Sequence, residues 1–248
     1  MTTGLLLLHA FPLDASMWQP QVEALSHLVP VVAPDFPGFG AGGGDPVEVL
    51  SMDLEADAAA RALSEAGIDQ ALVCGLSMGG YAALAFWRRY RSRVAGLVLA
   101  NTKSGGDDDA GKERRRALAA RLLAEGNGFL VESPPPLLSA GAPEDLWASV
   151  RATIAAQPAA AIASASLGMA ERPDSTPDLA GIDVPALVVT STGDTLIPPE
   201  ATSPMAGQIP MGRLVTLEGA GHLSNLEAPE AFTELLRGEL MAIGAVTG

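Results

Sequence analysis

The sequence predicts an α/β fold in which helices cover both faces of one mostly or wholly parallel sheet. Apolar runs of strand length alternate with longer helical patterns along most of the chain, which is typical of this fold class. Each strand-length run is an almost unbroken series of Leu, Val and Ala, as expected for strands buried on both faces. With 248 residues, of which 48% are hydrophobic and 18% charged, the chain can bury one large core.

Six segments have the length and apolar character of buried strands. They are Gly4–His9, Val29–Ala33, Ala71–Gly75, Gly96–Ala100, Ala186–Ser191 and Arg213–Leu217. Between and after these strands the apolar spacing predicts helices at Ser16–Ser26, Asp53–Ala66, Met78–Tyr90 and Ala228–Ile243. Ser51 is a suitable start signal for the second of these helices, and Gly67 is a suitable stop signal.

One long stretch interrupts the alternation of strands and helices. Between residues 102 and 182 the sequence has no convincing strand, but it has helical patterns at Asp107–Glu125, Glu144–Ala156 and Ala159–Met169. Turns rich in Gly and Pro separate these patterns. We therefore expect a core made of residues 1–101 and 183–248, with a helical insertion at 102–182.

The composition excludes several classes of function. A net charge of -14 repels phosphate backbones and anionic membrane surfaces, so we expect neither nucleic-acid nor membrane binding. The short run of Leu at residues 5–8 has the wrong flanks for a signal peptide, and the chain contains one cysteine, Cys74. A single cysteine excludes an internal disulfide and a Cys-based zinc site. These features predict a cytoplasmic protein.

The strongest motif is the segment Gly75-Leu76-Ser77-Met78-Gly79-Gly80, which directly follows a predicted strand and precedes a predicted helix. In that context the pattern G-x-S-x-G is typical of a nucleophile elbow, a sharp turn that lifts the serine hydroxyl above the sheet. Glycine is needed where a Cβ atom would clash in such a turn. The following helix directs its N-terminus at the site, which favours developing negative charge. Ser77 is therefore the candidate nucleophile.

A serine nucleophile needs a base, and the chain has three histidines. His27 lies in the first predicted helix, and His9 ends the first strand, where we expect it to hold a loop. His222 follows the last strand after Gly219-Ala220-Gly221, so we choose it as the general base and acid.

The base in turn needs an orienting carboxylate, and Asp194 follows the strand Ala186–Ser191 in Ser191-Thr192-Gly193-Asp194. The chain order serine, aspartate, histidine is the order of this class of site. Weaker alternatives for the acid are Asp35, Glu218 and Glu227. The segment after the preceding strand, Asn101-Thr102-Lys103, offers no acid.

A tetrahedral intermediate also needs an oxyanion hole. One donor is the backbone N–H of Met78, the residue after the nucleophile. The other should come from the loop after the first strand, His9-Ala10-Phe11-Pro12. Because Pro12 has no N–H, the natural donor is Phe11.

Five segments carry a resemblance to the α/β-hydrolase superfamily. They are HAFPLDASMW at 9–18, DFPGFG at 35–40, GLSMGG at 75–80, GDTLIP at 193–198 and GAGHLSNLE at 219–227. Their order and spacing match along nearly the whole chain, and they are most similar to the 3-oxoadipate enol-lactonase and carboxylesterase-like group. The sequence departs from that pattern at Ala10, where glycine is usual, and at the start of the chain, where an antiparallel hairpin usually precedes the first strand.

The resemblance implies six parallel strands with the 29–33 strand at one edge. An unprotected edge is a liability, so we expect a covering loop or a dimer contact there. It also implies that the inserted helices form a cap over the serine. Candidate residues lining a pocket under this cap are Phe129, Leu137, Leu138, Trp147 and Met169. The cluster Arg114-Arg115-Arg116 could bind a substrate carboxylate, but neighbouring helical residues diverge, so we expect a solvated face that balances Asp107-Asp108-Asp109.

The function that the resemblance implies is hydrolysis of a small carboxylic ester or lactone through an acyl-enzyme, without cofactor or metal. Alternatives on the same fold are a cofactor-free perhydrolase, of the haloperoxidase-like kind, and a carbon–carbon bond hydrolase. A module that only binds a small ligand is the non-enzymatic alternative. The acidic net charge favours a neutral ester over an anionic lactone, although one local arginine could outweigh it.

Overall fold

The computed structural model describes residues 1–246 and contains a six-stranded sheet in the order β2-β1-β3-β4-β5-β6. The strands are β1 (Thr3–Leu8), β2 (Val31–Val32), β3 (Gln70–Leu76), β4 (Val94–Ala100), β5 (Ala186–Ser191) and β6 (Gly212–Leu217). All neighbouring pairs are parallel. This arrangement confirms the predicted fold class and strand order, with the 29–33 segment at one edge.

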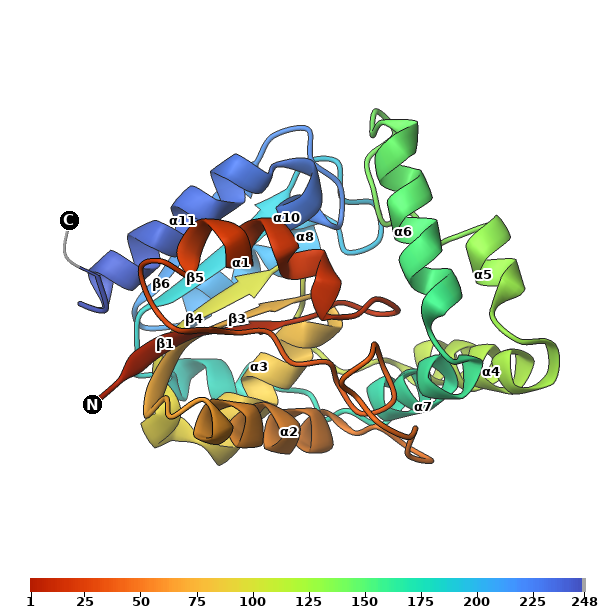
Figure 1. Ribbon diagram of the computed structural model, residues 1–248, viewed down its shortest axis with the longest axis horizontal. Coiled ribbons are helices and arrows are strands. Elements are labelled where there is room, and N and C mark those ends of the chain that lie inside the picture. Colours follow the sequence, from red (N-terminus) through yellow and green to blue (C-terminus); the bar gives the residue numbers. More distant parts are fainter. Residues whose placement is uncertain (247–248) are drawn as a thin grey trace.

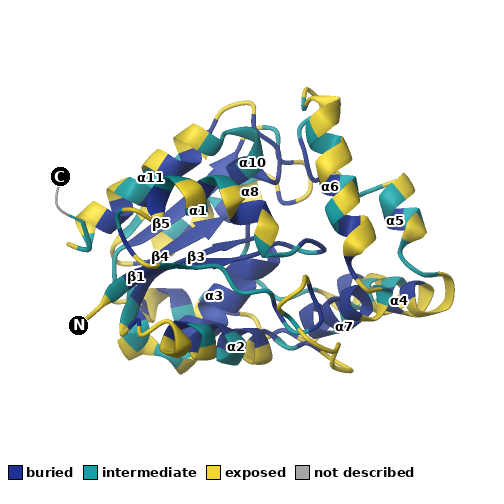
Figure 2. Ribbon diagram, in the orientation of Figure 1, coloured by how far each residue is buried: buried dark blue, intermediate teal, exposed yellow. Residues whose placement is uncertain are grey.

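Helices cover both faces of the sheet (Figure 1). Helices α1 (Gln19–Leu25) and α11 (Pro229–Ala242) lie on one face, and α2 (Met52–Glu65) and α3 (Met78–Arg89) lie on the other. As the sequence predicts, Ser51 caps α2 by accepting a hydrogen bond from the Leu54 N–H at 3.2 Å. Helix α3 is buried along almost its whole length (Figure 2), so the segment that follows Ser77 is held firmly.

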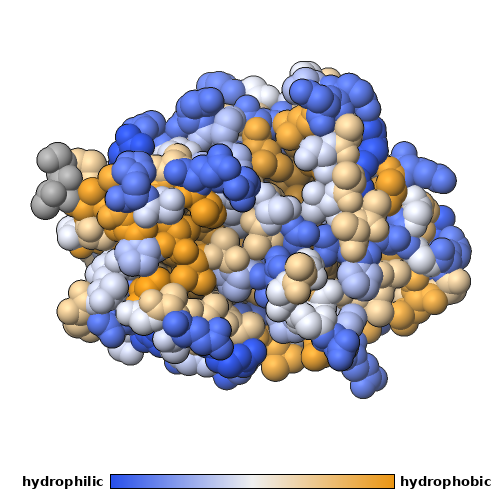
Figure 3. Space-filling model, in the orientation of Figure 1, coloured by the Kyte–Doolittle hydropathy of each residue, from blue (hydrophilic) through white to orange (hydrophobic). Residues whose placement is uncertain are grey.

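The edge strand β2 is shorter than the predicted strand at 29–33. Pro30 and Pro34 flank its two residues, and proline cannot donate a hydrogen bond to a neighbouring strand. A short edge strand offers little backbone for unwanted pairing. On the face shown in Figure 3 an apolar patch lies over the side of the molecule where β1 and α1 are drawn.

Four helices lie between β4 and β5, at the side of the molecule toward which the strands point (Figure 1). They are α4 (Asp109–Glu125), α5 (Gly128–Glu132), α6 (Glu144–Ala156) and α7 (Ala159–Ala170). Helix α5 was not predicted, because five residues are too few to show a helical period. Helix α4 begins two residues later than predicted, since Asp108 caps it through the Gly111 N–H at 2.7 Å.

Several shorter elements complete the chain. They are the 3₁₀ helices η1 (Ala15–Trp18), η2 (Arg91–Arg93) and η3 (Thr176–Gly181) and the α-helices α8 (Pro199–Thr202), α9 (Pro204–Gln208) and α10 (Ser224–Glu227). Within residues 1–246, no helix combines the length and apolar character needed to cross a bilayer.

Candidate active site

Ser77 occupies a strained turn between β3 and α3. Its backbone lies at φ 58° and ψ -114°, a region that L-residues rarely adopt. Close backbone approach explains the neighbouring glycines. A Cβ atom on Gly75 would lie 2.0 Å from the carbonyl oxygen of Gly79, and one on Gly79 would lie 2.1 Å from that of Leu8. The motif residues therefore form the sharp turn expected from the sequence, and Ser77 faces a cavity.

The structure brings Asp194 and His222 into direct contact. Nδ1 of His222 lies 2.8 Å from Oδ2 of Asp194, and both side chains are fully buried. The other oxygen, Oδ1, accepts hydrogen bonds from the N–H groups of Leu196 and Ile197, each at 2.9 Å. Burial raises the pKa of Asp194, but these bonds and those from His222 and Asn101 outweigh it and hold the pKa below its ordinary value. The carboxylate is therefore ionised at neutral pH.

The second ring nitrogen of His222 is unpaired among the described residues. Nε2 is buried and has no hydrogen-bond partner among residues 1–246. With Asp194 accepting at Nδ1, the neutral ring carries its proton on Nδ1 and leaves a lone pair on Nε2. A lone pair in this position can accept the proton of a serine hydroxyl. Hydrogen bonds between nucleophile and base are often long before substrate binds.

Asn101, which the sequence analysis set aside, contacts the candidate acid. Its amide Nδ2 donates to Oδ2 of Asp194 at 2.9 Å and to the hydroxyl of Ser191 at 2.7 Å. Its Oδ1 accepts a hydrogen bond from the hydroxyl of Ser224 at 2.6 Å. Asn101 was rejected because it is not an acid, yet its place at the end of β4, beside β5, was the signal that could have revealed it. It holds the carboxylate that orients His222.

The two proposed oxyanion donors lie at the start of α3 and after β1. The carbonyl of Ser77 accepts from the N–H groups of Gly80 at 2.9 Å and Tyr81 at 3.3 Å. Met78 is the first residue of α3, and a helix offers no carbonyl to the N–H of its first residue. Phe11 lines the same cavity as Ser77.

His9 has the structural role expected from the sequence. Its ring is fully buried, Nε2 accepts a hydrogen bond from the Phe36 N–H at 3.1 Å, and the ring centroid lies 4.4 Å from that of Phe36 and 5.3 Å from that of Phe39. Burial lowers its pKa to about 4, so the ring is neutral at physiological pH. His9 thus fastens the loop after β1 to the loop after β2. His27 is exposed.

The three alternative acids do not take the place of Asp194 beside the His222 ring. Asp35 accepts hydrogen bonds from the backbone N–H groups of Ala15 and Gly42, each at 2.9 Å, and so organises two loops. Glu218 is exposed. Glu227 accepts from the Gly221 N–H at 2.8 Å and from the backbone and hydroxyl of Ser139. It therefore joins the loop of the candidate base to the segment between α5 and α6.

A cavity of about 370 Å³ adjoins Ser77. Of the residues singled out from the sequence, Phe11, Leu137 and Met169 line this cavity with Ser77. The cavity is also lined by residues that the sequence did not indicate, namely Tyr81, Leu118, Pro135, Leu196 and Ile197. The cavity thus lies between the sheet core and the inserted helices, and most of its walls are apolar.

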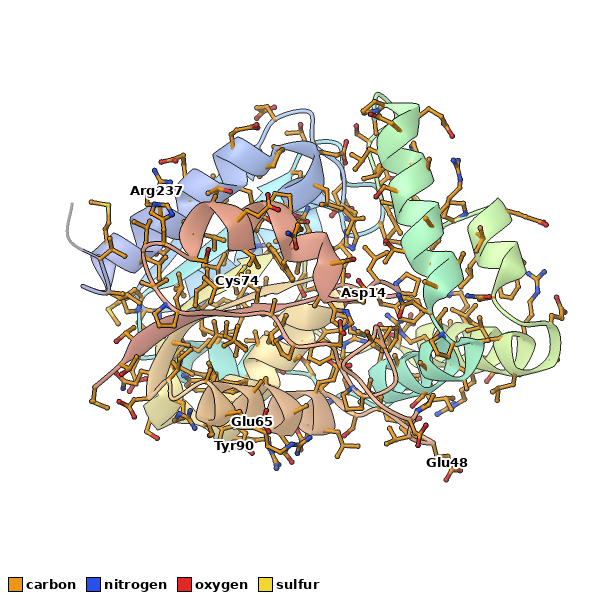
Figure 4. All side chains as sticks on the ribbon, in the orientation of Figure 1. Asp14, Glu48, Glu65, Cys74, Tyr90 and Arg237 are labelled. Atoms are coloured by element: carbon orange, nitrogen blue, oxygen red, sulfur yellow. The ribbon has the colours of Figure 1, made fainter. Side chains whose placement is uncertain are left out.

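Three other candidate lining residues pack away from this cavity. The guanidinium of Arg121 lies 3.7 Å from the ring centroid of Phe129, and that of Arg151 lies 5.4 Å from that of Trp147. Leu138 is buried in the core. Cys74, labelled within the sheet in Figure 4, is also buried, and burial raises the pKa of its thiol.

One wall of the cavity is polar, and it differs from the expected solvated face. Lys103, Asp107, Arg114 and Arg115 all line it. Arg116 turns away and pairs with Glu171 at 2.6 Å. The expectation that the adjacent arginines diverge is therefore confirmed. The expectation that all of them merely face solvent is wrong, because the packing of α4 along α7 directs two of them to the cavity.

With this geometry established, comparison with known proteins identifies the family. The family model described as "Alpha/beta hydrolase family" matches residues 5–235. The chain belongs to the alpha/beta hydrolase family. It is similar to a thermophilic esterase from Thermogutta terrifontis solved with malate bound, with a TM-score of 0.92, 40% identity, and coverage of 98% of this chain and 92% of that one.

Two further relatives are enol-lactonases. The 3-oxoadipate enol-lactonase 1 of Acinetobacter baylyi is 28% identical over 235 residues, covering 93% of this chain and 85% of the relative. The enol-lactonase from Burkholderia xenovorans LB400 is 27% identical, with a TM-score of 0.84 and coverage of 97% of this chain and 92% of that one. These relatives confirm the resemblance stated from the sequence motifs.

Proposed function

We propose that this hydrolase cleaves a carboxylic ester or lactone through an acyl-enzyme on Ser77. The observation that carries the proposal is the 2.8 Å contact between His222 Nδ1 and Asp194, which leaves the buried Nε2 of His222 without a partner among the described residues. Ser77 lies on a strained turn beside the cavity that would hold the ester. Esterases and enol-lactonases among the relatives support this class of reaction.

In the proposed first step Ser77 Oγ attacks the ester carbonyl carbon, and Nε2 of His222 takes the hydroxyl proton. The oxyanion accepts hydrogen bonds from the N–H groups of Met78 and Phe11. His222 then gives its proton to the leaving alkoxide, and the alcohol departs. In the second step water attacks the acyl-enzyme while His222 takes its proton, and the acid is released from Ser77. Throughout, Asp194 stabilises the imidazolium form of His222.

We also propose that residues 102–182 act as a cap over Ser77. Two sets of contacts fasten this segment to the core. Gln157, directly after α6, donates to the Asp14 carboxylate at 2.7 Å and accepts from the Gly40 N–H at 2.9 Å. Figure 4 labels Asp14 where η1 faces the inserted helices. On the other side Glu227 binds Ser139. A cap held in this way excludes water from the cavity.

We also propose a dimer contact at the edge strand β2, which size-exclusion chromatography with light scattering tests.

The proposed function is tested with p-nitrophenyl acetate, butyrate and octanoate. Wild-type protein should hydrolyse at least one ester with a burst of p-nitrophenol, and Ser77→Ala should lose at least about a hundredfold in kcat while keeping its melting temperature. Peracid formation in acetate and hydrogen peroxide would indicate the perhydrolase alternative. The absence of both turnover and burst would contradict the proposal and favour a carbon–carbon bond hydrolase or a binding module.

A further inference from the structure

Basic side chains gather on the polar wall of the cavity around one carboxylate. Asp107 Oδ1 lies 3.3 Å from Lys103 Nζ and 2.9 Å from Arg172 Nη2, while Oδ2 pairs with Arg115. Arg114 lines the same cavity and forms no ion pair among residues 1–246. Three cationic side chains therefore contact a single carboxylate, and a fourth, Arg114, lines the same cavity beside the candidate nucleophile.

One of these cations serves the fold. The side chain of Arg172 is 2% exposed, donates to the carbonyls of Met169 at 2.8 Å and Gly105 at 3.0 Å, and lies 4.1 Å from the ring centroid of Tyr81. It is not among the cavity walls and it matches the charge of Asp107 by itself. The bonds from the two arginines outweigh burial and hold the pKa of Asp107 below its ordinary value, so this carboxylate is ionised.

The remaining cations line the cavity in excess of its one carboxylate, Asp107. Lys103, Arg114 and Arg115 account for three of the 15 basic residues in a chain with a net charge of -14. Like charges gathered beside a mostly apolar cavity repel one another, and the partly buried Lys103 and Arg115 also lose part of their hydration, which is unfavourable unless an anion offsets it. Several basic residues elsewhere on this chain pair with neighbouring acids, as Arg116 does with Glu171 and Arg89 does with Asp57. The cavity wall is thus suited to an anionic ligand.

We propose that Lys103, Arg114 and Arg115 form a subsite for a second carboxylate on the substrate, so that the preferred esters or lactones are derived from dicarboxylic acids. This inference rests on the proposed function. The guanidinium groups are suited to a carboxylate because their planar N–H donors match its two oxygens. The apolar walls at Leu118 and Met169 would hold the short alkyl chain between the two carbonyl groups.

The test compares half-esters with neutral molecules of the same shape. The substrates are monomethyl succinate, glutarate and adipate, each paired with the methyl ester in which a methyl ketone replaces the free carboxylate. Methanol release gives kcat/KM for each. Wild-type protein should prefer the half-ester by at least about tenfold at one or more chain lengths. Lys103→Gln and Arg114→Gln should each lower that ratio by about tenfold.

Arg116→Gln is the matched control, since it removes the same charge from the same helix at a residue that pairs with Glu171 outside the cavity. It should leave the ratio unchanged. If wild-type protein hydrolyses the neutral esters and shows no preference for any half-ester, the carboxylate subsite is refuted while the proposed function stands. An equal loss in Arg116→Gln would also refute it, because overall charge would then explain the effect.

A binding measurement separates this inference from the proposed function. Calorimetry with glutarate and Ser77→Ala protein should show one site, weakened about tenfold when Arg114→Gln is added and unaffected by Arg116→Gln. If no ester is hydrolysed but glutarate binds in this way, the proposed reaction fails and the subsite is supported. If glutarate does not bind, the subsite is refuted.

Discussion

The replacement Asp194→Asn tests the orientation of the candidate base, because the surrounding donors dictate how the new amide must lie. Oδ1 of Asp194 accepts from two backbone N–H groups, those of Leu196 and Ile197, each at 2.9 Å. An asparagine keeps only one acceptor oxygen, and we expect it to stay with these two donors. Its NH₂ group then faces Nδ1 of His222 and the amide of Asn101, both of which donate to Oδ2 in the native site.

The consequence is the wrong tautomer of His222. Nδ1 must now accept a hydrogen bond, so the ring proton moves to Nε2, where it blocks uptake of the Ser77 proton. The charge that stabilises the imidazolium is lost as well. In Ser-His-Asp sites the corresponding change lowers kcat by about 10⁴. At about 1.4 kcal/mol per factor of ten, this equals about 5.5 kcal/mol of transition-state stabilisation, which lies within the range of two charge-assisted hydrogen bonds at about 1.5–3 kcal/mol each.

The assay is steady-state hydrolysis of p-nitrophenyl butyrate at pH 7–8, with thermal melting to show that the variant folds. We expect kcat to fall by 10³–10⁴-fold, as a rough estimate, with KM changed by less than about threefold. Asp35→Asn is the matched control, because that carboxylate also accepts two backbone N–H groups but lies in a different loop pair. A loss below tenfold in Asp194→Asn, or a larger loss in Asp35→Asn, would refute the assignment.

Three further changes test other parts of the structure. Gly75→Ala places a Cβ atom 2.0 Å from the Gly79 carbonyl oxygen, so we expect a stability loss of at least about 2 kcal/mol in urea unfolding and loss of esterase activity. Glu227→Gln removes one of the oxygens that hold Ser139, and kcat/KM should fall about tenfold, with a small drop in melting temperature. Glu55 is fully buried with neither carboxylate oxygen bonded among residues 1–246, and burial raises its pKa well above the ordinary value. Ionisation therefore disfavours the folded state increasingly as pH rises above about 4.5, and Glu55→Met should raise the melting temperature at pH 8 more than at pH 5.

The fold could be predicted because its buried strands are almost unbroken apolar runs. The β5 strand at Ala186–Ser191 and the α6 helix at Glu144–Ala156 have the predicted bounds, since their apolar spacing starts and stops sharply. Elements of two to five residues could not be predicted in this way. Strand β2 was predicted too long because the segment at 29–33 was interpreted only for its hydrophobicity, whereas Pro30 and Pro34 limit the pairing.

The candidate site was predictable where one residue type in a fixed order carries the chemistry. His222 is one of only three histidines, while Ser77 and Asp194 stand out by their motifs and by their positions at the ends of strands. Asn101 was missed because an amide has no independent catalytic role, and its importance comes only from its contacts with Asp194 and neighbouring hydroxyls. Phe129 was a candidate lining residue because it lies in the inserted segment, but its ring packs against the Arg121 guanidinium, a contact that the sequence does not reveal.

The net charge of the whole chain favours a neutral substrate, whereas the cations that line the cavity favour an anionic one. The distance of these charges from the bound substrate decides which effect is larger. The net charge of -14 favours a neutral ester over an anionic one. At physiological ionic strength, however, exposed charges farther away than about 8 Å are largely screened. A carboxylate about 4 Å from one cation gains about 4 kcal/mol at an effective dielectric constant near 20, before the cost of removing it from water. Because Lys103, Arg114 and Arg115 line the same cavity as Ser77 and exceed the charge of Asp107 there, we expect the local interaction to outweigh the distant acids once substrate has entered, while the acidic surface only slows its arrival.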